Sequence, residues 1–281
     1  MEIKGSTNIV GLIGHPVEHS FSPPMHNAAF KALEMDYVYT AFDVNPDDLE
    51  NAVAGAQALN IKGFNVTIPH KIEVMKYLNE IDEVASLIGA VNTIDFKDLK
   101  GYNTDGIGAL KAIGEVTNIK NKNVVIAGAG GASRAISFYI AKYGADKLTI
   151  LNRNVDKAQK LADDVLASGL IDDVSSDDIK NMDLKDADIL INTTPVGMHP
   201  NVDDAPIASG ELMHEDLVVF DAVYNPNETG LLKEAINAGA KPVYGIKMLL
   251  YQGAESFEIW TGKKAPIDVM EDALRKTLGF W

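Results

Sequence analysis

The sequence has 281 residues, of which 46% are hydrophobic and 23% are charged, and its formal net charge is −15. These values are typical of a folded globular chain and exclude a disordered one. An acidic surface repels phosphate groups, so neither nucleic acid nor an anionic membrane is an expected partner. The sequence contains no cysteine, which excludes disulfides and thiolate metal sites. No segment reaches about 20 apolar residues and no signal-peptide pattern is present, so we predict a cytoplasmic protein.

The first part of the chain alternates between strand and helix patterns. Strands are predicted over 8–14, 37–44 and 61–68, and helices over 22–35 and 47–60. Ser22 is the predicted N-cap of the first helix, because Pro23 then takes the first helical position. This alternation predicts an α/β protein with a mainly parallel sheet.

The alternation continues after a connecting helix predicted within 103–115. Strands are predicted over 122–128, 147–153, 187–194 and 217–224, and helices over 131–144, 155–168, 229–239 and 248–262. The acidic segment 171–188 is interpreted as a solvated loop and helix face. Trp260 and Trp281 are interpreted as packing residues, since apolar residues around the first recur at helical spacing. The sequence therefore predicts two α/β domains, 1–107 completed by helices in 246–281, and 108–245.

A glycine-rich turn is the strongest local motif. Gly128 and Gly130 follow an apolar strand and precede an amphipathic helix, and Ser133 stands where G-x-G-x-x-G has its third glycine. Such a turn lets the backbone approach a pyrophosphate, which the helix amino terminus then stabilises. The context favours dinucleotide binding, and the alternative is an ordinary tight turn.

The end of the next strand indicates which dinucleotide is bound. An NAD-selective fold usually carries an acid there for the ribose 2′-hydroxyl. This chain has Asn152 and Arg153 instead, with Lys157 one helical turn further on. A guanidinium suits a 2′-phosphate, so we favour NADP over NAD. The alternative is an ordinary surface arginine.

The segment 63–71, GFNVTIPHK, separates polar from apolar side chains if it is extended. One face carries Phe64, Val66 and Ile68, and the other carries Asn65, Thr67 and, beyond Pro69, Lys71. A carbonyl that receives hydride also needs a proton, and Lys71 is the leading candidate for a general acid and base. The alternative is a solvated lysine at the start of a helix.

The histidines do not form a metal motif. His15 and His19 are four residues apart, but Pro16 breaks any helix between them, and the sequence contains no HExxH. We predict no metal site. His70 is predicted to face away from Lys71 and is a weak catalytic candidate.

A set of motifs in order along nearly the whole chain resembles the shikimate dehydrogenase family. The motifs are HSFSPPMHNAAF, NVTIPHK, GAVNTI, NTDGIG, GAGGASRA, NRN, NTTPVGM, YNPNETGLL and GIKMLLYQGAESFEIWTG. The resemblance implies reversible NADPH-dependent reduction of 3-dehydroshikimate to shikimate. It also implies a Rossmann-type NADP domain inserted into a substrate domain, with the active site in a cleft between them.

The resemblance also implies roles for individual residues. Lys71 would be the proton shuttle, with Asp105 as its carboxylate partner. Ser20 and Ser22 would hold the substrate carboxylate. Residues that would contact ring hydroxyls or line the same pocket are Asn65, Thr67, Asn92, Asp105, Tyr224 and Gln252. Residues implied for the cofactor are Gly128, Ala129, Gly130, Gly131, Ala132, Ser133, Asn152, Arg153, Lys157, Ala222, Gly245 and Glu83.

The chain departs from the family pattern at Asn154, where many members carry a threonine that helps to bind the 2′-phosphate. An asparagine can also donate a hydrogen bond, so we interpret the change as tuning of NADP preference. Two alternatives are a quinate/shikimate dehydrogenase paralogue and a non-catalytic ligand-sensing protein of the same fold. The second is disfavoured because Lys71 and Asp105 are both present. The expected partner is a small molecule, and the chain is expected to be a monomer or homodimer.

Overall fold

The computed structural model describes residues 2–279 and divides into two compact units. The first unit contains the residues up to Thr104 together with those from Gln252 onward, and the second is Asp105–Tyr251. The chain leaves the first unit where helix α4 begins and returns to it within helix α8. Each unit is described by itself below.

The first unit contains a mixed sheet in which β2, β1 and β3 run parallel. The full order among the described residues is β2-β1-β3-β5-β6-β4, and β5 pairs antiparallel with both β3 and β6. The strands are β1 Asn8–Gly14, β2 Tyr37–Asp43, β3 Gly63–Val66, β4 Glu80–Ile81, β5 Thr93–Asp95 and β6 Lys100–Tyr102.

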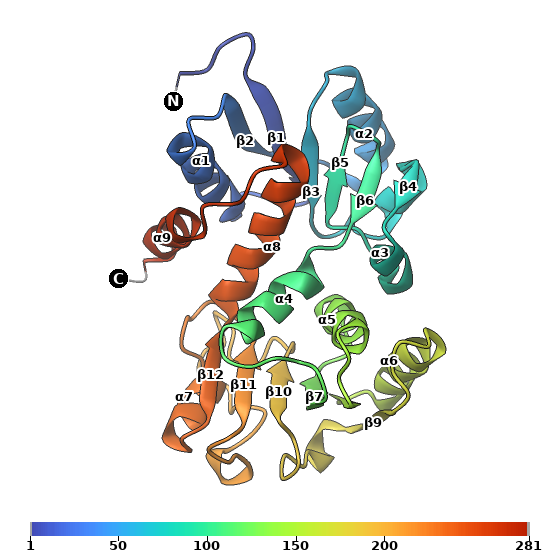
Figure 1. Cartoon of the computed structure of the whole chain (residues 1–281), viewed down its shortest axis with the longest axis vertical. Coiled ribbons are helices and arrows are strands. Elements are labelled where there is room, and N and C mark those ends of the chain that lie inside the picture. Colours follow the sequence, from blue (N-terminus) through green and yellow to red (C-terminus); the bar gives the residue numbers. More distant parts are fainter. Residues whose placement is uncertain (1, 280–281) are drawn as a thin grey trace. The chain divides into compact units, whose positions relative to one another are not determined.

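Helices pack around this sheet and bury its apolar side chains. They are α1 Ser22–Ala32, α2 Leu49–Ala58, α3 Glu83–Ile88, α8 Gly245–Thr261, which the units share, and α9 Ile267–Leu278, with short 3-10 turns at Pro46–Asp48 and Glu73–Tyr77. Phe64 and Val66 of β3 join Leu49 and Val53 of α2 in one apolar cluster. α1 packs against α9, and Figure 1 shows these two helices side by side.

The second unit is a doubly wound α/β domain. Its parallel strands are β7 Asn123–Ala127, β8 Lys147–Asn152, β9 Val174–Asp178, β10 Ile189–Asn192, β11 Val218–Asp221 and β12 Lys241–Tyr244. Their order is β12-β11-β10-β7-β8-β9. Numbered within the unit, this is the 3-2-1-4-5-6 order of Rossmann folds, in which ligands bind where the strand order reverses. Here the reversal lies between β7 and β10.

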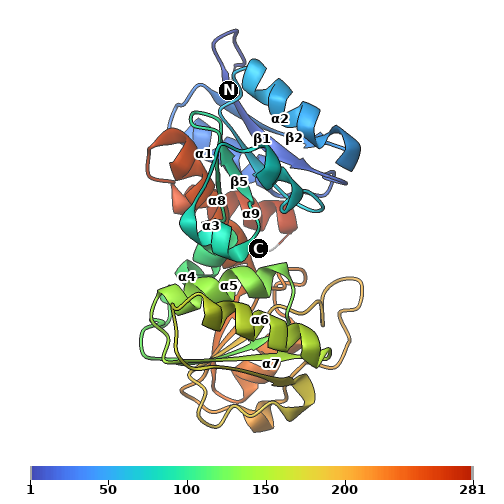
Figure 2. The same cartoon turned by 90° about the vertical axis from the view of Figure 1, so that its right-hand side faces the viewer.

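Helices cover the second sheet and close its core. They are α4 Asp105–Gly114, α5 Gly131–Lys142, α6 Val155–Ala167 and α7 Gly230–Asn237, with 3-10 turns at Ile179–Asn181 and Gly210–Leu212. Figure 2 shows α4, α5 and α6 in one layer over the strands of this unit. α7 packs against β11 and β12, where Leu232 and Ala235 join Leu190 and Val219 in an apolar cluster. The predicted α/β fold class, with mainly parallel sheets and a Rossmann-type domain, is confirmed.

Three local predictions were wrong, the first for a local reason and the other two for tertiary reasons. The helix α1 begins at Ser22 itself, and the Ser20 hydroxyl accepts from the Ser22 amide. The strand predicted over 61–68 is limited to Gly63–Val66, because its pairing with β1 ends at Val66 and its pairing with β5 ends at Asn65, and Ile68 is exposed. The acidic segment 171–188 contains edge strand β9, whose backbone pairs with β8 while its charged side chains stay in solvent.

Trp260 is a packing residue, as predicted. It is buried in the first unit, and its indole N–H donates to the Ile94 carbonyl over 2.9 Å. Trp281 lies outside the described residues. None of the helices within residues 2–279 has the length and apolar character needed to cross a membrane.

Candidate active site

The turn after β7 has the backbone geometry of a phosphate-binding loop. Gly128 adopts φ +113°, and a Cβ there would stand 2.3 Å from Thr193 Oγ1, so only glycine fits. Gly130 is extended and precedes the first residue of α5. Ser133 is buried and donates from Oγ to the Gly128 carbonyl over 2.7 Å, which closes the turn. The turn leads directly into the amino terminus of α5, where backbone N–H groups and the helix dipole favour an anion.

A pocket of about 490 Å³ lies beside this turn. It is lined by Ala129, Gly130, Asn152, Arg153, Asn154 and Lys157. The Asn154 side chain caps α6 by accepting from the Lys157 amide over 3.1 Å, which places Lys157 in the first helical turn. Two cationic side chains and no carboxylate line the pocket, so its chemistry suits a phosphate group.

The structure therefore gathers predicted cofactor residues from two βα turns around one pocket, and it assigns Asn154 a specific task. The Asn154 side-chain oxygen is used in the helix cap. The hydrogen bond to a 2′-phosphate that the sequence analysis expects from Asn154 would therefore have to come from its side-chain amide nitrogen.

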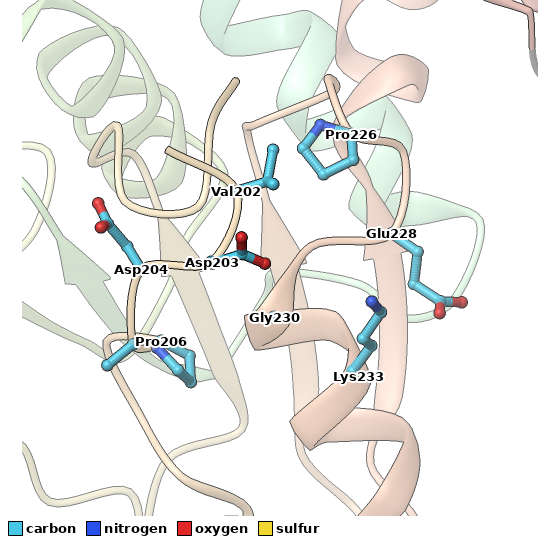
Figure 3. A pocket seen from close by; sticks show the side chains of 9 residues that line it. Val202, Asp203, Asp204, Pro206, Pro226, Glu228, Gly230 and Lys233 are labelled. Carbon is cyan, nitrogen blue, oxygen red and sulfur yellow. The ribbon is translucent and has the colours of Figure 1, made fainter. Parts of the chain in front are cut away.

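A second pocket in the same unit has the opposite charge. It measures about 410 Å³ and lies between the loop around Asp203 and Asp204 and the start of α7, with Glu228 before the helix and Lys233 within it (Figure 3). Three carboxylates against one ammonium would repel a phosphate. Charge therefore distinguishes the pocket beside Gly130 as the dinucleotide candidate.

The carboxyl ends of β10 and β11 carry a buried polar hub that sequence reasoning missed. Asp221 accepts hydrogen bonds from Thr229 Oγ1 over 2.6 Å, from Asn192 Nδ2 over 2.9 Å and from the Val223 amide over 3.0 Å. Burial raises the pKa of Asp221 to about 6, although these bonds favour its charged form. The signal available in the sequence was a pair of polar residues ending two neighbouring apolar strands.

The hydrogen bonds of Asp221 hold the loop after β11, which contains Ala222, a residue predicted to lie beside the nicotinamide. Gly245 begins α8 against the loop after β11, where an added Cβ would stand 2.7 Å from the Ala222 carbonyl and 2.5 Å from the Val223 carbonyl. Ala222 and Gly245 are thus brought together, as a shared site requires. Tyr224 follows in the same loop, and burial raises the pKa of its hydroxyl, so the group stays protonated.

In the first unit, the turn after β3 holds Lys71 in a defined place. The Thr67 amide donates to the Ile13 carbonyl, and the Val91 amide donates to the Lys71 carbonyl over 2.8 Å. His70 is buried, with Nε2 2.7 Å from the Val44 carbonyl. The half-buried Lys71 therefore lies on a turn anchored on both sides, and His70 serves this anchoring.

Asn65 and Asn92 belong to one hydrogen-bonded network in the first unit. Both are buried, and Asn65 Nδ2 donates to Ser256 Oγ over 2.8 Å and to Thr93 Oγ1 over 3.1 Å. Asn92 Nδ2 donates to Thr104 Oγ1 over 3.0 Å. The structure brings these residues together in one polar cluster, together with Ser256, which the sequence analysis did not single out.

Ser22 lies near this cluster through Tyr39. The Tyr39 hydroxyl donates to Asn65 Oδ1 over 2.9 Å. Burial raises the pKa of Tyr39, and a hydrogen bond with Ser22 opposes the shift. Ser22 and Asn65 are therefore joined through one buried phenol, which sequence reasoning also missed.

The remaining predicted residues lie at identifiable element ends. Asp105 is the first residue of α4, directly after Thr104. Gln252 lies in α8, and its carbonyl accepts from Ser256 Oγ over 3.0 Å. Glu83 is an exposed residue at the start of α3 in the first unit, where Asp82 caps the helix.

Three family models match the chain. The shikimate dehydrogenase substrate binding domain matches residues 12–94, the shikimate / quinate 5-dehydrogenase model matches 110–222, and the shikimate 5'-dehydrogenase C-terminal domain matches 245–275.

Relatives and solved structures agree with these models over almost the whole chain. A protein of Methanobrevibacter smithii named shikimate dehydrogenase (NADP(+)) is 69% identical, covering 98% of this chain and 99% of the relative. A crystal structure of shikimate dehydrogenase in complex with NADP+ is 52% identical with a TM-score of 0.92, covering 99% of this chain and 98% of the other. The Listeria monocytogenes shikimate 5-dehydrogenase, in complex with shikimate and NAD, is 37% identical with a TM-score of 0.93, covering 98% of each chain.

Proposed function

The chain belongs to the shikimate dehydrogenase family, and from this premise we propose that it interconverts 3-dehydroshikimate and shikimate with NADP(H). The observation that carries the proposal is the 69% identity to an NADP-dependent shikimate dehydrogenase over 98% of the chain. The cationic pocket beside the glycine turn supports the cofactor assignment independently of that likeness.

The residues of the second unit fit NADP. Gly128, Gly130 and the amino terminus of α5 would receive the pyrophosphate, since backbone N–H groups and the helix dipole favour an anion there. Arg153 and Lys157 would pair with the 2′-phosphate. Ala222 and Gly245 would lie beside the nicotinamide, where a side chain at Gly245 would meet backbone carbonyls. When bound, the dinucleotide supplies or accepts the hydride.

We assign the substrate to residues of the first unit, with Tyr224 as a further contact. Ser20 and Ser22, at the amino terminus of α1, would bind the carboxylate. Hydroxyl contacts are assigned to Thr67, Asn92, Tyr224 and Gln252. Lys71 would donate a proton to the oxygen that accepts hydride and recover it in reverse, with Asp105 as the carboxylate that favours the ammonium.

The family also includes a quinate-named model, so the substrate is tested directly. Shikimate and quinate are each mixed with NADP+ or NAD+, and the absorbance at 340 nm is followed. The proposal expects the fastest rise with shikimate and NADP+. A flat trace from folded protein in that mixture would refute the function, whereas faster turnover of quinate would support the paralogue alternative.

Lys71→Ala separates chemistry from binding. The variant should lose at least about 100-fold in kcat, within the usual range for removing a general acid and base, while shikimate still binds. Isothermal titration measures the binding. Retained kcat would remove the proton-shuttle role without touching the family assignment. A cytoplasmic location and a monomeric or homodimeric state stay predictions from the sequence.

A further inference from the structure

The side-chain amide of Asn65 is fully committed inside the first unit. A side-chain amide has two N–H donors and one carbonyl oxygen. Both donors are used, toward Ser256 Oγ at 2.8 Å and Thr93 Oγ1 at 3.1 Å. The oxygen accepts from the Tyr39 hydroxyl at 2.9 Å, and the residue is only 4% exposed. A ligand could gain a donor from Asn65 only by breaking one of these bonds.

The hydroxyl protons around Asn65 can be arranged in one consistent direction. Ser256 Oγ donates to the Gln252 carbonyl over 3.0 Å, which uses its single proton. In the 2.8 Å contact between Thr93 and Ser256, Thr93 is therefore the donor, and it shares this proton with Asn92 Oδ1, which lies 3.0 Å from Thr93 Oγ1. The Thr93 oxygen is then free to accept from Asn65. The direction runs from Asn65 through Thr93 and Ser256 to the backbone of α8.

A second branch holds the segment that precedes Asp105. Asn92 Oδ1 accepts from the Thr104 amide over 2.7 Å, and Asn92 Nδ2 donates to Thr104 Oγ1 over 3.0 Å. Thr93 Oγ1 lies 3.3 Å from Thr104 Oγ1, so the two branches meet. The network thus joins β3, the start of β5, the residue before α4 and α8.

Each of these segments carries a residue assigned to the substrate. Thr67 follows β3, Asn92 precedes β5, and Gln252 lies one turn before Ser256 on α8. Buried polar networks whose members are all satisfied fix a single arrangement of the segments that they join. A fixed arrangement matters here because substrate contacts misplaced by about 1 Å cost large factors in rate.

We propose that Asn65, Thr93 and Ser256 are positioning residues, which set the places of Asn92, Thr104 and the Gln252 peptide without touching substrate themselves. The proposal rests on the proposed function and deepens it. It replaces the direct substrate contact predicted for Asn65 with an indirect role. Thr93 and Ser256 are both 0% exposed, which leaves them no surface for a ligand.

Two substitutions of Thr93 provide the clearest test of the proposal. Thr93→Val keeps the shape and removes the hydroxyl, whereas Thr93→Ser keeps the hydroxyl. In the full chain, Thr93→Val should raise the KM for shikimate about 10-fold, as expected for one buried hydrogen bond between 1 and 2 kcal/mol, and Thr93→Ser should largely restore it. The KM for NADP+ should stay within about twofold, because the second unit is unchanged.

Ser137→Ala is the matched control. Ser137 is also a fully buried serine, but it lies on α5 of the second unit and its Oγ has no hydrogen-bond partner among the described residues. Removing this hydroxyl should leave the KM for shikimate unchanged. An equal rise in the Ser137 variant would show that the Thr93 effect is general destabilisation and would overturn the proposal.

A double-variant cycle distinguishes positioning from direct contact. If Asn65 and Ser256 act as a unit, Asn65→Ala with Ser256→Ala should raise KM no more than the worse single variant. Multiplied losses would show that Asn65 and Ser256 act independently, and a neutral Thr93→Val would show that the network does not position the substrate residues; either result would overturn the proposal. If the wild-type chain does not oxidise shikimate with NADP+, the proposed function fails and the positioning role fails with it. A Thr93→Val defect confined to shikimate supports the role even where Asn65→Ala does not fold.

Discussion

His26 is a titratable residue that the proposed chemistry does not use. It lies one turn after Ser22 on α1, stacked on Tyr39 with ring centroids 4.4 Å apart. Both ring nitrogens are buried without a hydrogen-bond partner among the described residues. Burial lowers the pKa of His26 from 6.5 to about 3, so the ring is neutral at pH 7. The neutral ring packs against Tyr39, and its contribution to the stability of the folded state depends on pH.

The sign of this dependence follows from the two pKa values. On acidification the unfolded chain binds a proton near pH 6.5, and the folded chain does so only near pH 3. The stability linked to His26 is therefore complete above pH 6.5 and falls as pH drops toward 3. Between pH 6.5 and pH 5 the loss is about 2 kcal/mol. Asp221 acts in the opposite direction, because burial raises its pKa from 3.8 to about 6 and the folded state takes up that proton first.

We predict that His26→Phe removes much of the acid sensitivity of stability. The aromatic stack is retained, but no group in it titrates. Urea unfolding at pH 7.5 and pH 5 should show a stability loss for the wild type that exceeds the loss for the variant by about 2 kcal/mol. Phe30→Leu, a core change beside the same ring stack, should lower stability equally at both pH values. Identical pH dependence in the wild type and His26→Phe would contradict the prediction.

Among the elements, the turn from β8 into α6 is the one to which we assign the choice between NADP and NAD. The sequence showed an arginine where NAD-selective folds carry an acid, and the structure places Arg153 and Lys157 on one pocket with Gly130. The Asn154 cap explains how Lys157 reaches that pocket, since it fixes the first turn of α6. We therefore expect NADP selectivity to depend on this short stretch of local structure.

We predict that Arg153→Ala weakens the binding of NADPH more than the binding of NADH. NADPH carries the 2′-phosphate that Arg153 would meet, so its KM should rise about 10-fold, while the KM for NADH should change less than about threefold. Steady-state kinetics with both cofactors measure the difference. Lys160→Ala is the control, because Lys160 is an exposed cation of α6 outside the pocket. Equal losses for the two cofactors would remove the 2′-phosphate assignment.

For the molecule as a whole, the second unit has its own sheet and its own apolar core. All strands of its sheet and its apolar cluster lie within Asp105–Tyr251. α4 and the first turns of α8 also belong to it, and the Glu115 carboxylate at the end of α4 pairs with Lys247 over 3.2 Å and with the Tyr251 hydroxyl. The chain that leaves the first unit at Thr104 re-enters it at Gln252.

We predict that residues 105–251, produced alone, fold cooperatively and bind NADP+. The dissociation constant should lie within about 10-fold of that of the full chain, because a domain with its own core keeps its local sites. Calorimetric unfolding and titration with NADP+ test both statements. The same fragment with Arg153→Ala should bind more weakly. A fragment without a thermal transition would show that this unit depends on the first one for its fold.

The amino-acid sequence was sufficient to predict the fold class and the family, and the outline of a cofactor site that it indicates stays a prediction. Short stretches of sequence encode these properties. They are the strand and helix periods, the glycine turn between them, and the cations at the end of the next strand. The alternation predicted the doubly wound unit correctly, and the ordered motifs predicted the family that the comparisons confirm. The roles of individual residues such as Lys71 and Asp105 stay predictions.

The end of β3, the existence of β9 and the partners of the buried polar groups become apparent only in the folded chain. No local pattern encodes these features, because their partners lie far away along the chain. Asn65 and Ser256 are separated by 191 residues but share a hydrogen bond of 2.8 Å. Period and composition show that Asn65 is polar and lies on a strand, but a hydrogen bond needs both partners in place, and folding alone brings them together.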